Sequence, residues 1–440
     1  MTTRSTASSA DAAAASNPSE PPIRRRARII GLDGVRGLLC LSIAITHVTG
    51  YYSKHTAAVW KTNIFGFSLV YFFVLSGFLL FLPYVRNVVA ERSSTRMPNT
   101  RDYAVHRLAR IMPVYLAIFL IVNFVLRLSY IHNAALAPDD TRTGVGVITN
   151  PGELLANLAL LQTYFPSYVE TGIGPSWSLT LEYAFYLSLP LLGWAVFRIR
   201  KRSTRNPFVL ATLAPSILLV VGLVGRALIP VVNRYAGTSD FILLNWGPNI
   251  AAVFTKSILT NADNFAMGMF AAIVFVAIER GALPERISRR VRMLSAVLIL
   301  PVLVVSAAFF AIAVQFVTAG VGVVAAMMIL IVVVPLARGR KSKLATFLDV
   351  RPIRYVGEIS LSAYLWHFPM LLLLGRLGWM AGDNLPGMLQ NIVLLLAATI
   401  LAATVTYYLV EKPAMNYARR IRAKKAPPSP ADPKVAAAVN

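Results

Sequence analysis

Apolar runs of about 20 residues, the length of helix that crosses the hydrocarbon core of a bilayer, recur in this chain from residue 29 to residue 410. Strands of a membrane barrel would be shorter and would alternate apolar with polar side chains. The composition agrees with helical spans, because 56% of the 440 residues are hydrophobic and the mean hydropathy is +0.62. The pattern predicts an all-α, polytopic membrane protein.

The apolar runs divide the chain into about ten predicted spans between two polar tails. Residues 1–28 end in an arginine cluster and are expected to form a disordered basic tail. Residues 29–413 form the membrane domain, and residues 414–440 form a basic, Ala- and Pro-rich cytoplasmic tail that is also expected to be disordered. The spans lie near residues 29–50, 63–84, 111–131, 177–198, 207–231, 257–279, 293–315, 317–337, 355–379 and 388–410.

The basic residues are concentrated on one side of the predicted membrane domain. This is the positive-inside pattern, so both termini are predicted to be cytoplasmic, in a bacterial inner membrane. The net charge of +24 then faces anionic lipid and anionic cytoplasmic substrates, and nucleic acid is not expected as a partner. Of the 43 Lys and Arg residues, 34 lie in the segments 1–28, 85–110, 198–206, 280–292, 338–354 and 411–440.

Two further regions have structural predictions of their own. Residues 132–176, on the outer side, include an apolar piece from Leu154 to Phe165 that is too short to cross the membrane. This stretch either shapes an external mouth or is a loop packed on the bundle. The spans 293–315 and 317–337 hold almost no polar residues and are joined by a tight turn, which predicts an antiparallel hairpin at the periphery.

Ionisable residues within the spans are costly in lipid and usually functional. Asp33, Arg36 and His47 lie in the first span, Glu182 in the fourth and His367 in the ninth. Arg36 and His47 are eleven residues apart, which turns a helix by about 1,100°, so they share one face at a separation of about 16 Å. These spans are expected to surround a polar cavity with a cation near one end and a proton acceptor near the other.

Metal and disulfide chemistry are not expected. Cys40 is the single cysteine and lies within an apolar span, so neither a disulfide within the chain nor a thiolate metal site is possible. The spacing of the five histidines matches no metal-ligand pattern, so we predict no metal.

Six segments with polar or glycine residues follow one another along the chain: Leu32 to Gly37 with His47, Phe72 to Phe78, Arg107 to Tyr115, Trp177 to Tyr186, Gly357 to Pro369 and Glu411 to Pro413. In this order they resemble the integral-membrane acyltransferase 3 family, the bacterial O-acyltransferases that modify sugars, glycolipids and macrolides. The resemblance covers residues 29–413. One departure is Leu361, where family members often carry tyrosine.

The resemblance implies acyl transfer from a cytoplasmic acyl-CoA, with acetyl-CoA expected as donor, to a hydroxyl group of a sugar, glycolipid or similar cell-envelope acceptor. His47 is the expected general base, because a neutral imidazole with an ordinary pKa of about 6.5 can take a hydroxyl proton at neutral pH. The alternative is a histidine that only packs helices together. Arg36 is expected to bind the donor or polarise its carbonyl oxygen, or to form an ion pair with Asp33.

Arg107 and Arg110, three residues apart at the start of the third span, carry guanidinium groups that suit phosphates. The resemblance points to this pair as a coenzyme A contact, and ordinary positive-inside anchoring is the alternative. Glu182 is expected to orient His47, to bind acceptor hydroxyls or to stabilise a neighbouring loop.

Four residues are expected to contact substrate rather than to carry the chemistry. Trp177 is either an interfacial aromatic or a surface on which a sugar stacks. His367 ranks below His47 as a base, and is expected to be a wall residue or a partner of His47. The full set is Asp33, Trp177, Tyr364 and His367.

Other functions remain open at this stage. A transporter or exporter of a glycolipid or glycan also fits ten spans with intramembrane charges, although the two halves show no repeat. A scaffold that binds lipid or protein would leave His47 unexplained. Within the acyltransferase hypothesis, direct transfer and an acyl-histidine route are both open, the acceptor and the oligomeric state are unspecified, and no appended soluble hydrolase-type domain is expected.

Overall fold

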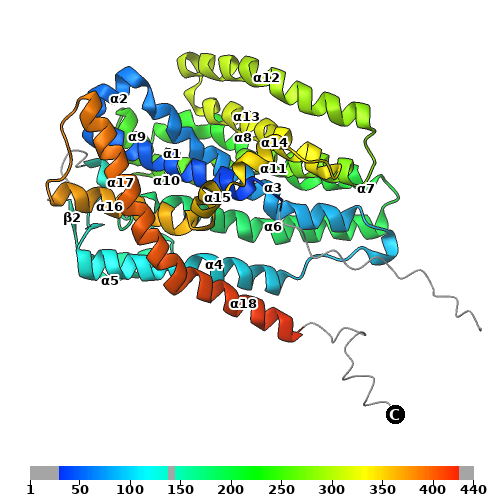
Figure 1. The fold of residues 1–440 in the computed structure, drawn as a ribbon, viewed down its shortest axis with the longest axis horizontal. Helices are drawn as coiled ribbons and strands as arrows, with labels where there is room; N and C mark the ends of the chain where they lie inside the picture. The colour runs from blue at the N-terminus through cyan, green and yellow to red at the C-terminus, as the bar shows by residue number, and fades with distance from the viewer. Residues whose placement is uncertain (1–28, 137–143, 426–440) are drawn as a thin grey trace, which may run out of the picture.

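The computed structural model describes residues 29–136 and 144–425, which form a bundle of long, roughly parallel helices (Figure 1). Within these residues, nine helices are long and apolar enough to cross a membrane, and a tenth span results if two helices that meet at a bend count as one. The predicted all-α polytopic fold of about ten spans is confirmed. The location of both termini on the cytoplasmic side stays a prediction.

The long helices are α1 (Leu32–Tyr52), α3 (Ser68–Val88), α4 (Thr100–Leu120), α6 (Trp177–Arg202), α8 (Leu213–Asn233), α11 (Ile258–Glu279), α12 (Glu285–Ile312), α13 (Val317–Ala337), α16 (Ser360–Arg376) and α17 (Leu385–Thr406). The shorter helices are α2 (Lys54–Trp60), α5 (Pro151–Leu158), α7 (Pro207–Ala211), α9 (Phe241–Trp246), α10 (Ile250–Thr255), α14 (Lys343–Leu348), α15 (Arg351–Glu358) and α18 (Lys412–Lys425). The 3₁₀ and π segments are η1 (Thr62–Phe67), η2 (Arg92–Ser94), η3 (Ile121–Leu126), η4 (Ala134–Leu136), η5 (Gln162–Tyr164), η6 (Gly174–Ser176), η7 (Val314–Phe316) and η8 (Tyr407–Glu411). Strands β1 (Ser129–Tyr130) and β2 (Val145–Gly146) pair antiparallel.

The centre of the bundle is the contact between α3 and α11. A side chain at Gly268 would lie 1.8 Å from the carbonyl oxygen of Val74, so only glycine lets these two backbones approach so closely. A buried ion pair joins the neighbouring helix α8 to α11, because Arg226 Nε donates to Asp263 Oδ2 over 2.9 Å. Arg226 also donates to the hydroxyl of Thr318 on α13, so its buried guanidinium is both ion-paired and hydrogen-bonded.

Helix α1 packs against a bent pair of helices, α15 and α16. These two helices meet at Ile359 with a bend of 75°, so the predicted span 355–379 is broken near its start. A side chain at Gly357 of α15 would lie 1.8 Å from the carbonyl oxygen of Asp33, which shows how closely α1 and α15 approach. The bend directs α16 along α1, and the Cys40 thiol donates to the carbonyl of Ser360.

The predicted hairpin of spans 293–315 and 317–337 corresponds to α12 and α13, joined by η7. Helix α12 lies at the edge of the bundle, with 11% of its apolar window buried (Figure 1). Helix α13 packs against α11 and α3, and half of its window is buried. The peripheral location therefore holds for α12, whereas α13 is part of the bundle.

Residues 127–136 and 144–176 lie at one end of the bundle (Figure 1), where η4 packs against α9. The apolar piece from Leu154 to Phe165 forms only the second half of α5 and the short η5, and its residues Leu160, Gln162 and Thr163 are buried. Asn157 is fully buried there, and its carbonyl accepts a hydrogen bond from the Tyr115 hydroxyl over 2.8 Å.

Two predicted boundaries differ from the structure. Helix α4 begins at Thr100 rather than near residue 111, which places Arg107 and Arg110 about two to three turns inside the helix. Helix α18 extends to Lys425, so residues 414–425 are helical where a disordered tail was expected. Residues 1–28 and 426–440, the remaining predicted tails, lie outside the described residues.

Candidate active site

Three cavities follow one another through the bundle. The first, which we call the entry cavity, has a volume of about 430 Å³ and lies between α3 and the first turns of α4. The second, the arginine cavity, has a volume of about 100 Å³ and is lined by Arg36, Arg107 and Arg110. The third, the histidine cavity, has a volume of about 500 Å³ and is lined by His47 and Trp177.

Neighbouring cavities share lining residues, so they adjoin. Leu79, Leu80 and Arg107 line both the entry cavity and the arginine cavity. Leu69 and Tyr364 line both the arginine cavity and the histidine cavity. The structure thus places a row of adjoining cavities, here called the path, from the start of α4, past three arginines, to the imidazole of His47.

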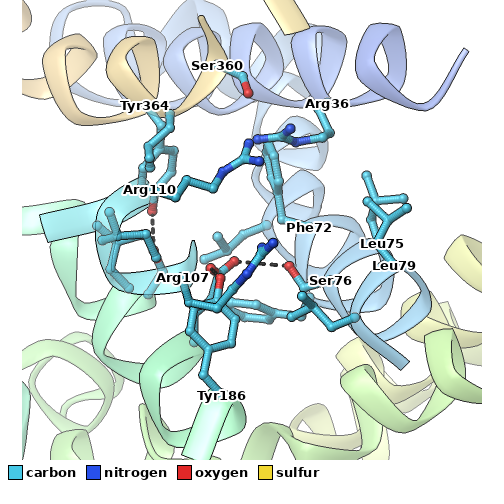
Figure 2. Close-up of a pocket in the computed structure, with 18 residues that line it drawn as sticks. Arg36, Phe72, Leu75, Ser76, Leu79, Arg107, Arg110, Tyr186, Ser360 and Tyr364 are labelled. Carbon is cyan, nitrogen blue, oxygen red and sulfur yellow. Dashed lines mark hydrogen bonds between the residues drawn. The ribbon is translucent and has the colours of Figure 1, made fainter. Parts of the chain in front are cut away.

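The arginine cavity brings together cations from two helices (Figure 2). Arg36 comes from α1, and its guanidinium points toward that of Arg110 from α4. Arg107 also projects from α4 into this space, and its buried Nε has no hydrogen-bond partner among the described residues. Three guanidinium groups around one small cavity favour a ligand with phosphate or carboxylate oxygens.

Glu182 of α6 supplies a carboxylate to the same cavity. Its Oε2 accepts a hydrogen bond from the Tyr186 hydroxyl over 2.5 Å, and its Oε1 accepts one from the Ser76 hydroxyl over 3.2 Å. These partners place Glu182 with the arginines rather than against the ring of His47. The expected role of Glu182 in orienting His47 therefore falls to another residue.

Asp33 and Arg36 form the ion pair that the sequence offered as an alternative. Arg36 Nη1 lies 3.8 Å from Asp33 Oδ1, one helical turn away on α1. Asp33 lines the entry cavity, and Arg36 lines the arginine cavity. The carboxylate can therefore orient the guanidinium while both face the path.

His47 is paired with His367 of α16. His47 Nδ1 lies 2.8 Å from His367 Nε2, and the two rings are nearly coplanar, with an angle of 7° between them. His367 is 1% exposed, and its other nitrogen, Nδ1, is hydrogen-bonded to the carbonyl of Tyr364. Phe368 contacts the edge of the His47 ring and completes the support.

If both rings are neutral, their hydrogen bonds assign one proton to each ring. A carbonyl oxygen only accepts, so His367 carries its proton on Nδ1 and presents an unprotonated Nε2. His47 must then donate from Nδ1 to His367, which leaves the Nε2 of His47 unprotonated. That nitrogen is the proton acceptor that a general base needs.

Tyr364 and Trp177 line the same cavity as His47. The Tyr364 hydroxyl donates to the carbonyl of Pro175 over 2.9 Å and lies 2.7 Å from the Ser178 hydroxyl. This fixes the Tyr364 ring between the arginine cavity and the histidine cavity. Trp177 begins α6 and lines the histidine cavity, so both predicted substrate contacts border the path.

Sequence reasoning missed two residues that line the histidine cavity, Glu170 and Trp246. Glu170 lies in the connection between η5 and η6, and Trp246 ends the short helix α9. Both residues lie outside the long apolar spans, and acidic or aromatic residues are common in such connecting segments. Only the three-dimensional structure, which places them in the same cavity as His47, identifies them. Within the described residues there is no group of three or more His, Cys, Asp or Glu that could hold a metal ion.

Comparison with known proteins agrees with this geometry. The acyltransferase 3 profile (Acyl_transf_3, Acyltransferase domain) matches residues 29–411. The O-acetyltransferase OatA of Staphylococcus aureus is 24% identical over 390 residues, which are 87% of this chain and 56% of that protein. The acyltransferase MdmB of Streptomyces mycarofaciens is 29% identical over 178 residues, which are 39% of this chain and 40% of that protein.

This chain thus spans about half the length of the curated relatives it matches. No solved structure matches it. The profile nevertheless covers almost the whole described bundle, including all three cavities and the paired histidines. The chain therefore belongs to the acyltransferase 3 family, and nine to ten helices among its described residues are long and apolar enough to cross a membrane.

Proposed function

We propose that this enzyme moves an acetyl group from a cytoplasmic acyl-CoA to a hydroxyl group of a cell-envelope carbohydrate or glycolipid, with His47 as general base. The observation that carries the proposal is the row of adjoining cavities that runs from three arginines to the imidazole of His47, whose Nδ1 is hydrogen-bonded to His367. The name of the relative OatA, an O-acetyltransferase, supports an acetyl donor. In this proposal the enzyme lies in the bacterial inner membrane with both termini cytoplasmic.

The donor enters through the entry cavity. Coenzyme A carries a diphosphate and a 3′-phosphate, and the guanidinium forks of Arg107 and Arg110 match such groups in geometry and charge. The arginine cavity, at about 100 Å³, is narrow and suits the thin pantetheine arm better than the nucleotide. The arm then passes Arg36 and Tyr364 and brings the thioester toward His47.

The acceptor enters through the histidine cavity on the other side of Tyr364. The Nε2 of His47 takes the proton of the acceptor hydroxyl as the oxygen attacks the thioester carbonyl carbon. The new C–O bond forms, the C–S bond breaks, and the departing thiolate takes the proton back from His47. The products are an ester and free coenzyme A, with no net change in protons on the enzyme.

His367 acts as a positioning residue in this mechanism. Its Nε2 accepts from His47 Nδ1–H both before and after His47 takes a proton, so the ring stays oriented through the cycle. An acyl-histidine intermediate would use the same Nε2 as nucleophile, and water or hydroxyl would then release the acyl group. Label that stays on the protein and is released by hydroxylamine would distinguish this route from direct transfer.

The test is transfer from ¹⁴C-acetyl-CoA in membrane vesicles that carry wild-type enzyme or His47→Ala. We expect the His47→Ala vesicles to lose label incorporation at equal protein level. His132→Ala is the matched control, because His132 is exposed and lines none of the three cavities. Full incorporation by His47→Ala would disprove the assignment of His47 as the base.

A further inference from the structure

We infer that the histidine cavity contains a subsite for the sugar ring of an uncharged acceptor, built from Glu170, Trp177 and Trp246. The carboxylate of Glu170 accepts hydrogen bonds from ring hydroxyls, and the two indole rings form an apolar wall against the C–H face of the sugar. The inference rests on the proposed function, because it names the contacts of the acceptor beside the base His47.

Glu170 is a buried carboxylate that protein groups satisfy only in part. Its side chain is 7% exposed, and Oε1 lies 3.5 Å from Lys256 Nζ without making a hydrogen bond among the described residues. A side chain at Gly174 would lie 3.8 Å from Oε2, so glycine leaves that side of the carboxylate open. Glu170 and Gly174 both line the histidine cavity. A buried carboxylate oxygen that is ion-paired but accepts no hydrogen bond is only partly compensated, and hydroxyl donors of a ligand would satisfy it.

Lys256 holds the aromatic wall in place. Its Nζ lies 3.8 Å from the centre of the Trp246 ring and 5.4 Å from that of Trp177. The two indole rings are 6.0 Å apart and inclined at 76°, so they form a corner rather than a stack. A cation on the aromatic faces fixes both rings, while both rings remain part of the cavity lining.

The subsite is preorganised by a second contact. The amide of Asn133 donates to the carbonyl of Val169 and to the carbonyl of Trp246, each over 2.8 Å. These bonds tie the segment before Glu170 to the end of α9. A ligand therefore meets rings and carboxylate already in position, which lowers the entropic cost of binding.

Charge and size favour an uncharged ring as ligand. The ammonium of Lys256 balances the carboxylate of Glu170, so this part of the cavity offers hydrogen bonds without net charge. Lys256 also donates to the carbonyl of Asn245. Lys256 therefore has a second partner, and Glu170 can also bind a ligand. The cavity volume of about 500 Å³ lies within the range of small-molecule sites.

Burial raises the pKa of Glu170 to about 7, and Lys256 opposes that shift. Near neutral pH the carboxyl group can therefore both accept and donate hydrogen bonds, as the hydroxyl groups of a sugar do. A carboxylate that served only to neutralise a cation would not need to border the cavity beside Gly174 and His47.

The test uses membrane vesicles supplied with ¹⁴C-acetyl-CoA and compares wild type with Glu170→Gln and Trp246→Leu. The double variant Glu170→Gln/Lys256→Met removes both charges, in case the single variant leaves the Lys256 charge without a counterion and fails to fold. Trp379→Leu is the matched control, because Trp379 is 56% exposed and lines none of the three cavities.

We expect label on a sugar residue of the product after mild hydrolysis. Transfer by Trp246→Leu and by the double variant should fall about tenfold to a hundredfold at an unchanged KM for acetyl-CoA, since each alters the acceptor subsite and leaves the arginine cavity intact. Trp379→Leu should match wild type. Label on a non-sugar hydroxyl, or transfer within about twofold of wild type in these variants, would overturn the subsite. Full transfer by His47→Ala would instead refute the proposed function.

Discussion

The contact between His47 and His367 makes the most specific prediction. His367→Leu removes the nitrogen that accepts from His47 Nδ1 over 2.8 Å and replaces it with apolar atoms of similar bulk. The Nδ1 proton of His47 then has no partner in a buried site, and the ring is free to turn or to move its proton to Nε2. Either change takes the basic nitrogen away from the acceptor.

The expected size of the effect follows from the energy of one buried hydrogen bond. A buried donor left without a partner costs about 1–3 kcal/mol, and 1.4 kcal/mol corresponds to about tenfold in rate, so kcat should fall about fivefold to 150-fold. The KM for acetyl-CoA should change less than about twofold, because the arginines lie in a separate cavity.

The assay is the initial rate of ¹⁴C-acetyl transfer in vesicles at matched protein level. His367→Gln offers an amide oxygen at about the position of Nε2 and should restore part of kcat, whereas a purely structural role for His367 would depend on bulk and favour leucine. His132→Leu, at an exposed position, controls for loss of an imidazole. A His367→Leu enzyme with wild-type kcat would refute the proton assignment. A His367→Gln enzyme whose kcat is no higher than that of His367→Leu would refute it as well.

Three further predictions concern the donor, the fold and pH. Arg110→Lys keeps the charge but loses the planar fork, so KM for acetyl-CoA should rise about tenfold at similar kcat, with exposed Arg101→Lys as control; an unchanged KM would exclude a phosphate contact. Gly268→Val forces Cβ to within 1.8 Å of the Val74 carbonyl, so no folded peak is expected in detergent size-exclusion chromatography, while Gly50→Ala, which meets open space, should give a wild-type peak. Because the pKa of Glu170 is raised from 4.5 to about 7, its contribution to stability is full below pH 4.5 and is lost as pH rises through about 7. Thermal unfolding of Glu170→Gln should therefore depend less on pH in that window, and an equal dependence would contradict the shift.

Most of the architecture could be predicted because hydropathy and helical periodicity are local properties. Ten apolar runs predicted the spans, and the eleven-residue spacing predicted that Arg36 and His47 lie along one path. The exceptions are helix bends and helix ends, which depend on contacts with other segments of the chain. The bend at Ile359, the early start of α4 and the helical extension to Lys425 depend on what each segment packs against.

The sequence by itself determined the membrane class, the family and the identity of the base candidate, since each rests on residues close together or on motifs in fixed order. Only the tertiary structure decided which nitrogen of His47 is free, because its partner His367 stands 320 residues away and the partner's own proton is set by the Tyr364 carbonyl. It also placed Glu182 in the cavity that the three arginines line and brought Glu170 and Trp246 into the cavity that His47 lines. Contacts of this kind depend on how closely helices such as α1 and α15 approach, and no local pattern of residues encodes that distance.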